Sequence, residues 1–290
     1  MQDKDMTILD FLEQSLPVPV GSIPLSQCKI LRPYLLERKG ISTRGTAFLF
    51  AVPYVLCEDV KNPARNLSLY AVPRDYHGYF ETLGQRLLPA LKAHFPAFEF
   101  ALFADHSPLD EVHAAAICGM GVVGLNGLFI HQTYGSFVFL AEVVTDAPWE
   151  SATGLGADAI PEGRVKSCHA CGACVRACPA GCLPNHREGC LSALTQKKGT
   201  LTPDEIQKLK SHPLVWGCDT CQMVCPYNQL AIKKKKDTPI TYFREQRYVH
   251  ITAEDILAMS DEDFAMRAFA WRGRAVILRN LEIKKSEGDT

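Results

Sequence analysis

In the first half of the chain, the pattern of apolar and polar residues alternates between short runs typical of strands and longer segments with helical periodicity. Three runs are short, aromatic and β-branched, which is typical of strands: Thr46–Pro53, Phe98–Ala104 and Ser136–Val144. Between the first two, Tyr79–Phe95 places a set of leucines on one helical face, namely Leu83, Leu87, Leu88 and Leu91. The pattern predicts an α+β domain over residues 1–160.

Capping residues mark the expected starts of several helices. Ser107 suits an N-cap, with Pro108 at the first helical position and Asp110 at the third, which is close to a capping box. Thr202 opens a second pattern of the same kind. The tail of the chain returns to helix, with expected caps at Thr252 and Ser260.

A linker rich in Gly, Ala and Pro, Ser151–Lys166, separates the first domain from a cysteine-dense region. We therefore divide the chain into three parts. Residues 1–160 form the α+β domain, residues 161–232 form a cysteine-rich module, and residues 233–290 form a helical segment that packs on the rest.

Length and composition narrow the class of protein. The chain has 290 residues, is 47% hydrophobic and carries a net charge of −1, so it can bury a substantial core and its overall charge marks no partner. Its first residues lack the apolar run of a signal peptide, and no run of about 18 apolar residues predicts a membrane span. We expect a cytoplasmic monomer in which twelve cysteines serve metal or redox chemistry rather than disulfides.

The first cysteine run has the spacing Cys168-x2-Cys171-x2-Cys174-x3-Cys178 and is followed by a proline. Bacterial ferredoxins have this spacing: three cysteines wrap one [4Fe–4S] cluster and the fourth ligates another. Zinc is a weaker competitor, because zinc sites pair two CxxC knuckles without a CxxxCP tail. The run therefore predicts a ferredoxin-like module with two [4Fe–4S] clusters.

The second run, Cys218-x2-Cys221-x3-Cys225, supplies three ligands, so a second cluster needs one more. Cys190 lies between the runs and is the first candidate for this ligand, while Cys182 is its rival.

A crossed arrangement gives each cluster ligands from both runs. One cluster takes Cys168, Cys171, Cys174 and Cys225, and the other takes Cys178, Cys190, Cys218 and Cys221. The cysteines with apolar neighbours are expected to be small buried hydrophobes, and they are Cys28, Cys57 and Cys118.

Three segments of the cysteine-rich module, Cys168–Pro179, Gly189–Thr195 and Trp216–Asn228, resemble the epoxyqueuosine reductases. These are the cobalamin-dependent iron–sulfur enzymes of tRNA queuosine synthesis. Their pattern has a lone cysteine before an (S/T)-x-L-T segment and the signature GCDxCQxxCPxN, and this chain has both. The match supports Cys190 as a cluster ligand.

The resemblance extends to roughly residues 45–285. The chain has a tyrosine followed by an RDYH segment, an aspartate motif, a glycine-rich stretch and a closing helix that are similar to those of the family. These segments are Tyr70 with Arg74–His77, Ala104–Leu109, Gly121–Ile130 with Tyr134–Ser136, and Arg272–Arg274 with Arg279–Asn280.

The resemblance implies a nitroreductase-like cobalamin-binding domain, as in reductive dehalogenases, followed by the double [4Fe–4S] module, with cobalamin between them. One cluster would pass low-potential electrons from an external donor to cobalamin. The implied activity is the reduction of epoxyqueuosine to queuosine in tRNA. The implied cofactor or substrate contacts are Tyr70, Arg74, Tyr76, His77, Gly124, Asn126, Tyr134 and Ser136.

Asp105 is implied by the resemblance as the catalytic acid that protonates the departing epoxide oxygen. It follows an expected strand and precedes an expected helix, so its carboxyl can project into a cleft. To hold a proton at neutral pH its pKa must be raised, and we expect burial to raise it. The alternative is that Asp105 is a turn or capping residue.

The basic run Lys233–Lys236 is the candidate contact for tRNA phosphates. The alternative is a solvated loop. Other basic residues would extend the patch if they share its face, and they are Lys197, Lys198, Arg244 and Arg247.

The chain departs from the family in three places. It lacks the arginine-containing segment before the first strand, the lysine and tryptophan around the glycine-rich stretch, and a HEAT-like C-terminal extension. Two other functions therefore stay open. One is a cobalamin-dependent reductase of a small oxygenated or halogenated compound, and the other is an electron-transfer iron–sulfur protein.

Overall fold

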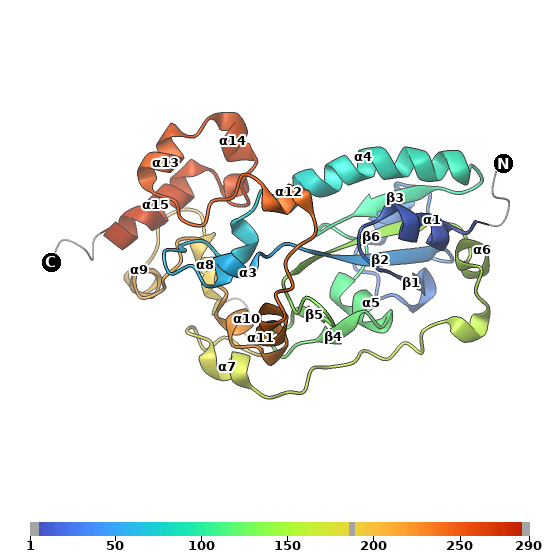
Figure 1. The fold of residues 1–290 in the computed structure, drawn as a ribbon, viewed down its shortest axis with the longest axis horizontal. Coiled ribbons are helices and arrows are strands. Elements are labelled where there is room, and N and C mark those ends of the chain that lie inside the picture. Colours follow the sequence, from blue (N-terminus) through green and yellow to red (C-terminus); the bar gives the residue numbers. More distant parts are fainter. Residues whose placement is uncertain (1–5, 186–188, 286–290) are drawn as a thin grey trace. The chain divides into compact units, whose positions relative to one another are not determined.

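The computed structural model describes residues 6–185 and 189–285 (Figure 1). They form two compact units. The first unit comprises the chain up to Pro53 and the segments His77–Gly124 and Leu128–His169. The second comprises Tyr54–Tyr76, Leu125–Gly127 and the chain from Ala170 onward. The second unit is therefore assembled from separate stretches of sequence.

The first unit is built around a four-stranded antiparallel sheet in the order β1-β2-β6-β3. All three strands expected from the sequence are present in this sheet, so the α+β prediction is confirmed. The strands are β1 (Val20–Pro24), β2 (Thr46–Pro53), β3 (Phe100–Phe103) and β6 (Val138–Thr145), and a separate hairpin pairs β4 (Gly121–Val123) with β5 (Phe129–His131).

The helices α4 (Tyr76–His94) and α5 (Glu111–Ile117) cover opposite faces of this sheet (Figure 1). The ring of Phe80 on α4 lies 6.3 Å from that of Phe50, while Ala115 on α5 packs with Ala51. Since neighbouring residues of a strand point to opposite faces, Phe50 and Ala51 serve the two helices separately. The other helical elements of this unit are α1 (Ile8–Ser15), η1 (Leu25–Gln27), α2 (Pro33–Glu37), α6 (Trp149–Thr153) and η3 (Ala157–Ala159).

The leucine face expected between the first strands lies on α4. Leu83, Leu87 and Leu91 are buried there, whereas Leu88 is half-buried and lines a surface groove. The prediction of one buried leucine face is therefore right for three of the four residues.

The helix expected to start at Ser107 begins instead at Glu111, so this prediction is wrong. Asp110 is its N-cap, and its carboxylate accepts from the His113 N–H at 3.2 Å. The Ser107 hydroxyl donates to the Glu142 carboxyl and accepts from the Leu109 N–H at 2.9 Å. Ser107 thus hydrogen-bonds to a buried carboxyl on β6 instead of capping the helix as the sequence pattern had predicted.

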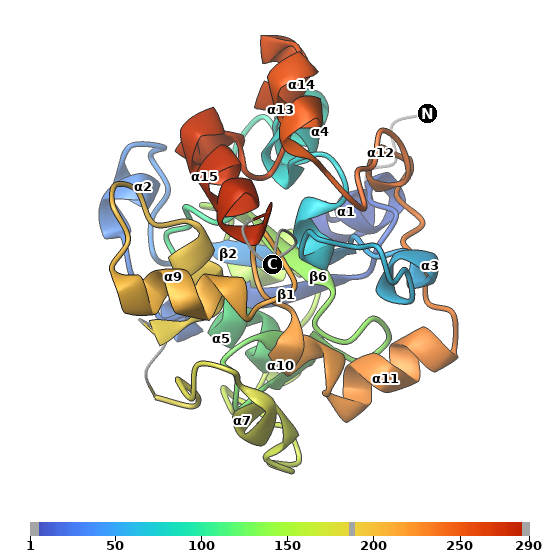
Figure 2. The same cartoon turned by 90° about the vertical axis from the view of Figure 1, so that its left-hand side faces the viewer.

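The second unit is helical in its described part, and its core gathers around Trp216, whose ring lies 6.0 Å from that of Phe269. Figure 2 shows α13, α14 and α15 grouped together at its C-terminal end. In the described chain, no helix has the length and apolar character needed to cross a membrane. The helical elements are α3 (Cys57–Val60), η2 (Leu69–Ala71), α7 (Ala173–Ala177), α8 (Leu191–Thr195), α9 (Pro203–Lys210), α10 (Thr220–Met223), α11 (Pro226–Lys233), α12 (Thr241–Arg244), α13 (Ala253–Ala258), α14 (Asp261–Ala265), η5 (Ala270–Arg272) and α15 (Arg274–Lys285).

The caps expected in the second half of the chain are confirmed. Thr202 and Thr252 form capping boxes with Glu205 and Asp255 at the starts of α9 and α13. The Ser260 hydroxyl accepts from the Asp263 N–H at the start of α14. In each case an oxygen side chain satisfies an N–H of the first turn, as the sequence pattern indicates.

The cysteines expected to be buried hydrophobes are half-buried, so this prediction is right only about their apolar setting. Cys28 and Cys118 pack against the core beside β1 and β2, and burial raises the pKa of the Cys28 thiol to about 12. Cys57 begins α3, where its N–H donates to the Asp237 carboxylate. Thiols held in the neutral form are poor nucleophiles.

Asn280 on α15 joins two segments that border the cysteine runs. Its side-chain N–H groups donate to the carbonyls of Thr195 (2.7 Å) and Val215 (2.9 Å). The residue is 2% exposed, so water is not a substitute donor for these carbonyls. The closing helix therefore holds the end of α8 next to the chain that leads to Cys218.

We expect Asn280→Leu to destabilise the protein by about 2–4 kcal/mol, because two buried carbonyls lose their donor. The melting temperature of the cluster-loaded protein, measured without oxygen, should fall by several degrees. Glu282→Gln is the control, since this residue lies exposed on the same helix. An unchanged melting temperature for Asn280→Leu would contradict the structural role of this amide.

Candidate active site

Three predicted cluster ligands of the second unit lie at the ends of short helices. Cys178 is the C-cap of α7, while Cys190 and Cys225 are the N-caps of α8 and α11.

Thiols from both runs gather in the second unit. Electrostatic coupling joins the Cys190 thiol to those of Cys218, Cys221 and Cys182, and the Cys221 thiol to that of Cys174. The Cys182 Sγ also lies 3.5 Å from the Cys178 Sγ, so both Cys190 and its rival are near the predicted ligands.

Cys168 belongs to the first unit. Its N–H donates to the Val123 carbonyl at 2.9 Å, at the end of β4. The next ligand of the predicted run, Cys171, is exposed in the second unit.

Within residues 6–185 and 189–285, no three His, Cys, Asp or Glu side chains converge closely enough to bind a single metal ion. A zinc site would require such convergence, because its thiolates each lie about 2.3 Å from the same ion. In a [4Fe–4S] cluster each thiolate binds a different iron atom, so the sulfurs stand further apart.

The second run is fixed by a buried ion pair. Arg65 Nη1 lies 2.6 Å from Asp219 Oδ2, which also accepts from the Leu69 N–H at 2.9 Å. Gly217, which directly precedes Cys218, has φ +75, and a Cβ there would lie 2.2 Å from the Ser68 hydroxyl. The GCD part of the signature thus has a packing reason: Gly217 permits close approach and Asp219 anchors the loop.

Three predicted cofactor contacts have partners inside the second unit. The Asn126 side chain hydrogen-bonds to the Cys221 thiol, which lowers the pKa of that thiol against the larger effect of burial. The Tyr70 hydroxyl accepts from the Gln196 amide at 3.5 Å, and burial raises the pKa of this phenol. The Arg74 guanidinium stacks 3.9 Å from the centre of the Tyr242 ring.

The basic run Lys233–Lys236 is exposed after α11. Two residues that would extend it if they shared its face have acidic partners of their own. Arg247 forms a buried ion pair with Asp59, and Lys197 pairs with Glu205 at 2.6 Å. The basic patch is thus smaller than the sequence suggested.

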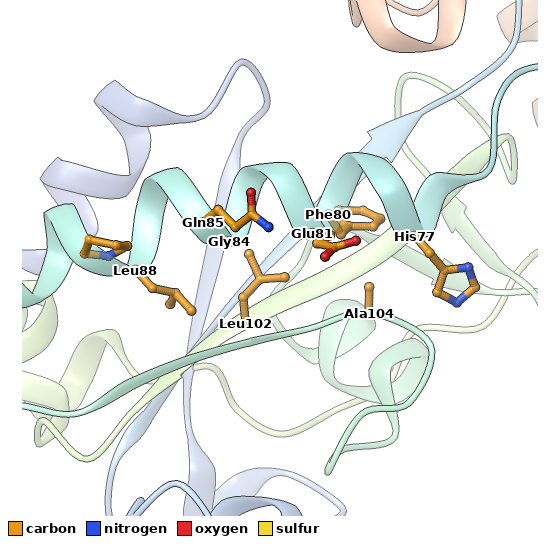
Figure 3. Close-up of a pocket in the computed structure, with 9 residues that line it drawn as sticks. His77, Phe80, Glu81, Gly84, Gln85, Leu88, Leu102 and Ala104 are labelled. Carbon is orange, nitrogen blue, oxygen red and sulfur yellow. The ribbon is translucent and has the colours of Figure 1, made fainter. Parts of the chain in front are cut away.

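A groove of about 610 Å³ runs along α4 in the first unit (Figure 3). His77 and Ala104 lie at one end and Leu88 at the other, with Leu102 of β3 forming part of the wall. Asp105 directly follows Ala104, and its Oδ2 lies 3.8 Å from His77 Nε2. The structure therefore brings the predicted acid and one predicted contact residue together at the end of the groove.

The Asp105 side chain is 68% exposed, so the burial expected for it is not present in the protein alone. Asp105 also has φ +66, a left-handed conformation that is uncommon for a residue other than glycine. The turn alternative is correct as a description of its backbone. A backbone held in this conformation often marks a functional position.

The other predicted contacts of the first unit follow the β4–β5 hairpin. The Gly124 N–H donates to the Leu128 carbonyl at 2.9 Å and closes the turn. Tyr134 has its ring 5.4 Å from that of His131, and Ser136 is buried. Tyr76, the last residue of the segment Tyr54–Tyr76 of the second unit, is half-buried.

Comparisons with known proteins agree with this arrangement. Residues 167–228 match the family model of the 4Fe-4S double cluster binding domain. A protein of Burkholderia pseudomallei named epoxyqueuosine reductase is 35% identical over 169 residues, which are 57% of this chain and 41% of the relative. The chain is similar to the epoxyqueuosine reductases. The predicted double [4Fe–4S] module is thereby confirmed.

Solved epoxyqueuosine reductases share the fold. The structure from Streptococcus thermophilus superposes with a TM-score of 0.71 at 23% identity, over 96% of this chain and 79% of that one. Another, solved with a tRNA-Tyr epoxyqueuosine-modified stem loop, gives a TM-score of 0.70 at 22% identity, over the same shares of the two chains. The fold predicted from the resemblance is therefore confirmed.

This chain spans about half the length of the curated epoxyqueuosine reductases that it matches, with 41%, 53% and 57% of three of them covered. The match in sequence therefore concerns a part of those proteins.

Two acidic residues lie outside the motifs that resemble the epoxyqueuosine reductases. Glu142 is fully buried in the middle of β6, and its carboxyl hydrogen-bonds with that of Glu111 at the start of α5. Burial raises the pKa of Glu111 to about 7 and that of Glu142 well above its usual range. A signal was available in the sequence, since Glu142 interrupts an apolar strand pattern.

This pair makes stability depend on pH with a defined sign. In the unfolded chain a glutamate loses its proton near pH 4.5, whereas in the folded protein Glu111 keeps it until about pH 7. The folded state therefore binds more protons between these values, and stability falls as the pH rises.

We expect the melting temperature of the wild-type protein to fall between pH 6 and pH 8. Glu142→Gln should reduce this fall, because an amide donates to Glu111 without titrating. Glu99→Gln is the control, since this exposed carboxylate pairs with Lys92 at the surface. Equal slopes for the wild type and Glu142→Gln would contradict the carboxyl pair.

Proposed function

We propose that this protein is a cobalamin- and iron–sulfur-dependent reductase that converts epoxyqueuosine in tRNA to queuosine. The observation that carries the proposal is the meeting of Asp105 and His77 at the end of an open groove, in a chain with a double [4Fe–4S] module. The curated relatives named epoxyqueuosine reductase support it, as does the related structure with an epoxyqueuosine-modified stem loop.

The cluster ligands form part of the proposal. One cluster takes Cys168, Cys171, Cys174 and Cys225, and the other takes Cys178, Cys190, Cys218 and Cys221. The proximity of the Cys190 thiol to those of Cys218 and Cys221 supports the second set.

Cobalamin fits some of the residues predicted to hold it better than others. Arg74 stacks on Tyr242, Tyr70 meets Gln196, and Asn126 meets Cys221, so these side chains serve the second unit itself. The proposed holders are therefore His77 in the groove, its neighbour Tyr76, and Gly124, Tyr134 and Ser136 in and after the β4–β5 hairpin. When bound, cobalamin supplies a strongly reducing cobalt centre, which receives electrons from the clusters and ultimately from an external low-potential donor.

Asp105 supplies the proton in the proposed reaction. Opening the epoxide to a carbon–carbon double bond consumes two electrons and two protons and releases the oxygen as water. The carboxyl of Asp105 protonates that oxygen as its bonds to carbon break, and general acids typically contribute about 100- to 10,000-fold. His77 lies 3.8 Å from Oδ2, a distance that permits electrostatic pairing with the carboxylate. A bound substrate covers this exposed carboxyl and raises its proton affinity by excluding water.

The exposed run Lys233–Lys236 is the proposed contact for the phosphates of tRNA. Binding through it should weaken with salt, because each neutralised phosphate releases a counterion. We also propose that the protein is a monomer and that it acts in the cytoplasm, the compartment in which tRNA is available.

The test is anaerobic turnover of tRNA that contains epoxyqueuosine, with product measured by nucleoside mass spectrometry. Queuosine should form with the cluster-loaded protein only when cobalamin is added. Asp105→Asn should lower turnover by about 100- to 10,000-fold while cobalamin still binds, because the amide lacks a transferable proton. Glu150→Gln, an exposed change on α6, is the control.

Full turnover by Asp105→Asn with cobalamin bound would remove the acid role from this residue. Absence of queuosine with the wild type, despite a changed cobalamin spectrum, would favour a small oxygenated or halogenated substrate. An unchanged cobalamin spectrum would favour an electron carrier.

The ligand assignment has its own test, which is the iron content of purified variants. Cys190→Ala should lose about half of the iron and acid-labile sulfide, because one of the two clusters lacks a ligand. Cys182→Ala is the matched control and should keep both clusters. The opposite pattern would make Cys182 the ligand and Cys190 its neighbour.

A further inference from the structure

Two carboxyl groups meet beneath the turn that carries Asp105. Glu142 lies in β6, opposite Leu49 of β2 and Phe103 of β3, and is 0% exposed. Its Oε1 accepts from the Ser107 hydroxyl. The carboxyl of Glu111 hydrogen-bonds with that of Glu142 from the start of α5. The acidic pair thus connects the sheet, the helix and the turn between them.

The pair requires a shared proton. In the described chain, no donor reaches Glu142 Oε2, and a carboxylate oxygen buried without a donor is costly. Two carboxylates in contact also repel each other. One of them therefore stays protonated, and its O–H donates a hydrogen bond to the other. Glu142 is the more deeply buried of the two, which assigns the retained proton to it.

The charges that face the pair come from three elements. Arg32 favours ionisation of Glu111, and its guanidinium donates to the Ser107 carbonyl at 2.9 Å. The Asp105 carboxylate disfavours that ionisation from the turn after β3. Cys28 is coupled to Glu142, but burial keeps its thiol neutral. Ionisation of Glu111 is therefore favoured by the charge of Arg32 and disfavoured by the charge of Asp105.

The link to Asp105 is a backbone hydrogen bond. The Asp105 N–H donates to Glu111 Oε1 at 3.3 Å. Asp105 adopts φ +66, which a residue with a side chain seldom keeps without outside support. The adjacent His106 is held separately, with its Nε2 3.2 Å from the Tyr34 hydroxyl. Glu111 is thus the side-chain acceptor that holds the backbone of the proposed acid.

We propose that Glu111 is a positioning residue for Asp105, and that the proton shared with Glu142 sets how firmly it holds the Asp105 turn. This inference rests on the proposed function only for the catalytic role of Asp105. A hydrogen bond to an ionised acceptor is stronger than one to a neutral acceptor. The turn is therefore held more tightly once Glu111 is ionised, with Glu142 donating to it from the other side.

The charge of Glu111 has a second effect on Asp105. Coupling between two titrating groups is mutual, so an ionised Glu111 makes ionisation of the neighbouring Asp105 carboxyl less favourable. Both effects suit a proton donor, because its backbone is fixed and its proton is retained.

The test is hydrogen–deuterium exchange of the Asp105 amide in the cluster-loaded protein, resolved by fragmentation and corrected for intrinsic exchange at each pH. In the wild type, protection of this amide should rise about tenfold between pH 6 and pH 8. In Glu111→Gln protection should stay low at both values, because the acceptor is neutral. In Glu142→Gln it should be high at both values, because the amide donates to an ionised Glu111.

Asp110→Asn is the matched control. It removes a carboxylate from the same loop but keeps an N-cap for α5, so the pH-dependent rise should remain. A rise that survives in Glu111→Gln, or that is lost equally in Asp110→Asn, would overturn the proposal. All of these variants preserve side-chain size, and their melting temperatures report whether the fold is kept.

The exchange measurement needs neither cobalamin nor tRNA, so its outcome is separate from that of the reductase assay. If the wild type reduces epoxyqueuosine, Glu111→Gln should lower kcat about tenfold and leave KM for tRNA unchanged. An unchanged kcat would overturn the positioning role. Failure of the wild type to form queuosine would count against the proposed function and leave the exchange result intact.

Discussion

The buried Asp219 carboxylate governs the position of the second cysteine run. It stands between Cys218 and Cys221 in sequence and is 2% exposed, so its charge needs partners from the protein. Arg65 and the Leu69 N–H provide them. Loss of either charge would leave the other buried and unpaired, which costs about 3–5 kcal/mol. The loop that carries two predicted cluster ligands is thus fixed by a segment about 150 residues earlier.

Other contacts of the second unit surround this ion pair. The Gly217 N–H donates to the Thr195 hydroxyl at 2.9 Å, and Asn280 binds the carbonyls of Thr195 and Val215. These bonds tie the chain that follows Cys190 to the chain that precedes Cys218. Buried polar networks are stable when every member is satisfied, and they then permit few alternative arrangements.

The first unit uses a buried carboxyl in a different way. Asp219 is paired with a cation, whereas Glu142 is paired with another acid and keeps a proton. The first arrangement fixes a charge in place, and the second allows the charge to change near neutral pH. A rigid support suits a cluster loop, while a titrating support suits a residue that handles protons.

The sequence was sufficient for features that depend on local patterns. Thr46–Pro53 was predicted as a strand with its observed bounds, and the caps at Thr202, Thr252 and Ser260 were found from neighbouring residues alone. The spacing of the cysteines identified the double-cluster module. In each case the signal lies within about a dozen residues.

Features that depend on distant partners were missed. Ser107 lost its capping role to Glu142, which lies 35 residues away, and Arg247 pairs with Asp59 instead of joining the basic patch. Burial of Asp105 was expected from its motif, but the turn leaves its side chain exposed. Whether a polar side chain meets solvent, a helix end or a buried partner is decided by tertiary contacts, which no local pattern contains.

The interleaving of the two units has a consequence for how the chain folds during synthesis. Asn66 hydrogen-bonds to the backbone of Ile251, and Leu67 pairs with Trp216, so the segment Tyr54–Tyr76 meets its partners only after more than half of the remaining chain has been made. Contacts of such long sequence separation form slowly. The first unit has its whole sheet once β6 emerges from the ribosome, whereas the cysteine-rich unit must wait for its C-terminal helices. Iron is therefore best delivered after translation, to a chain whose sheet is already folded.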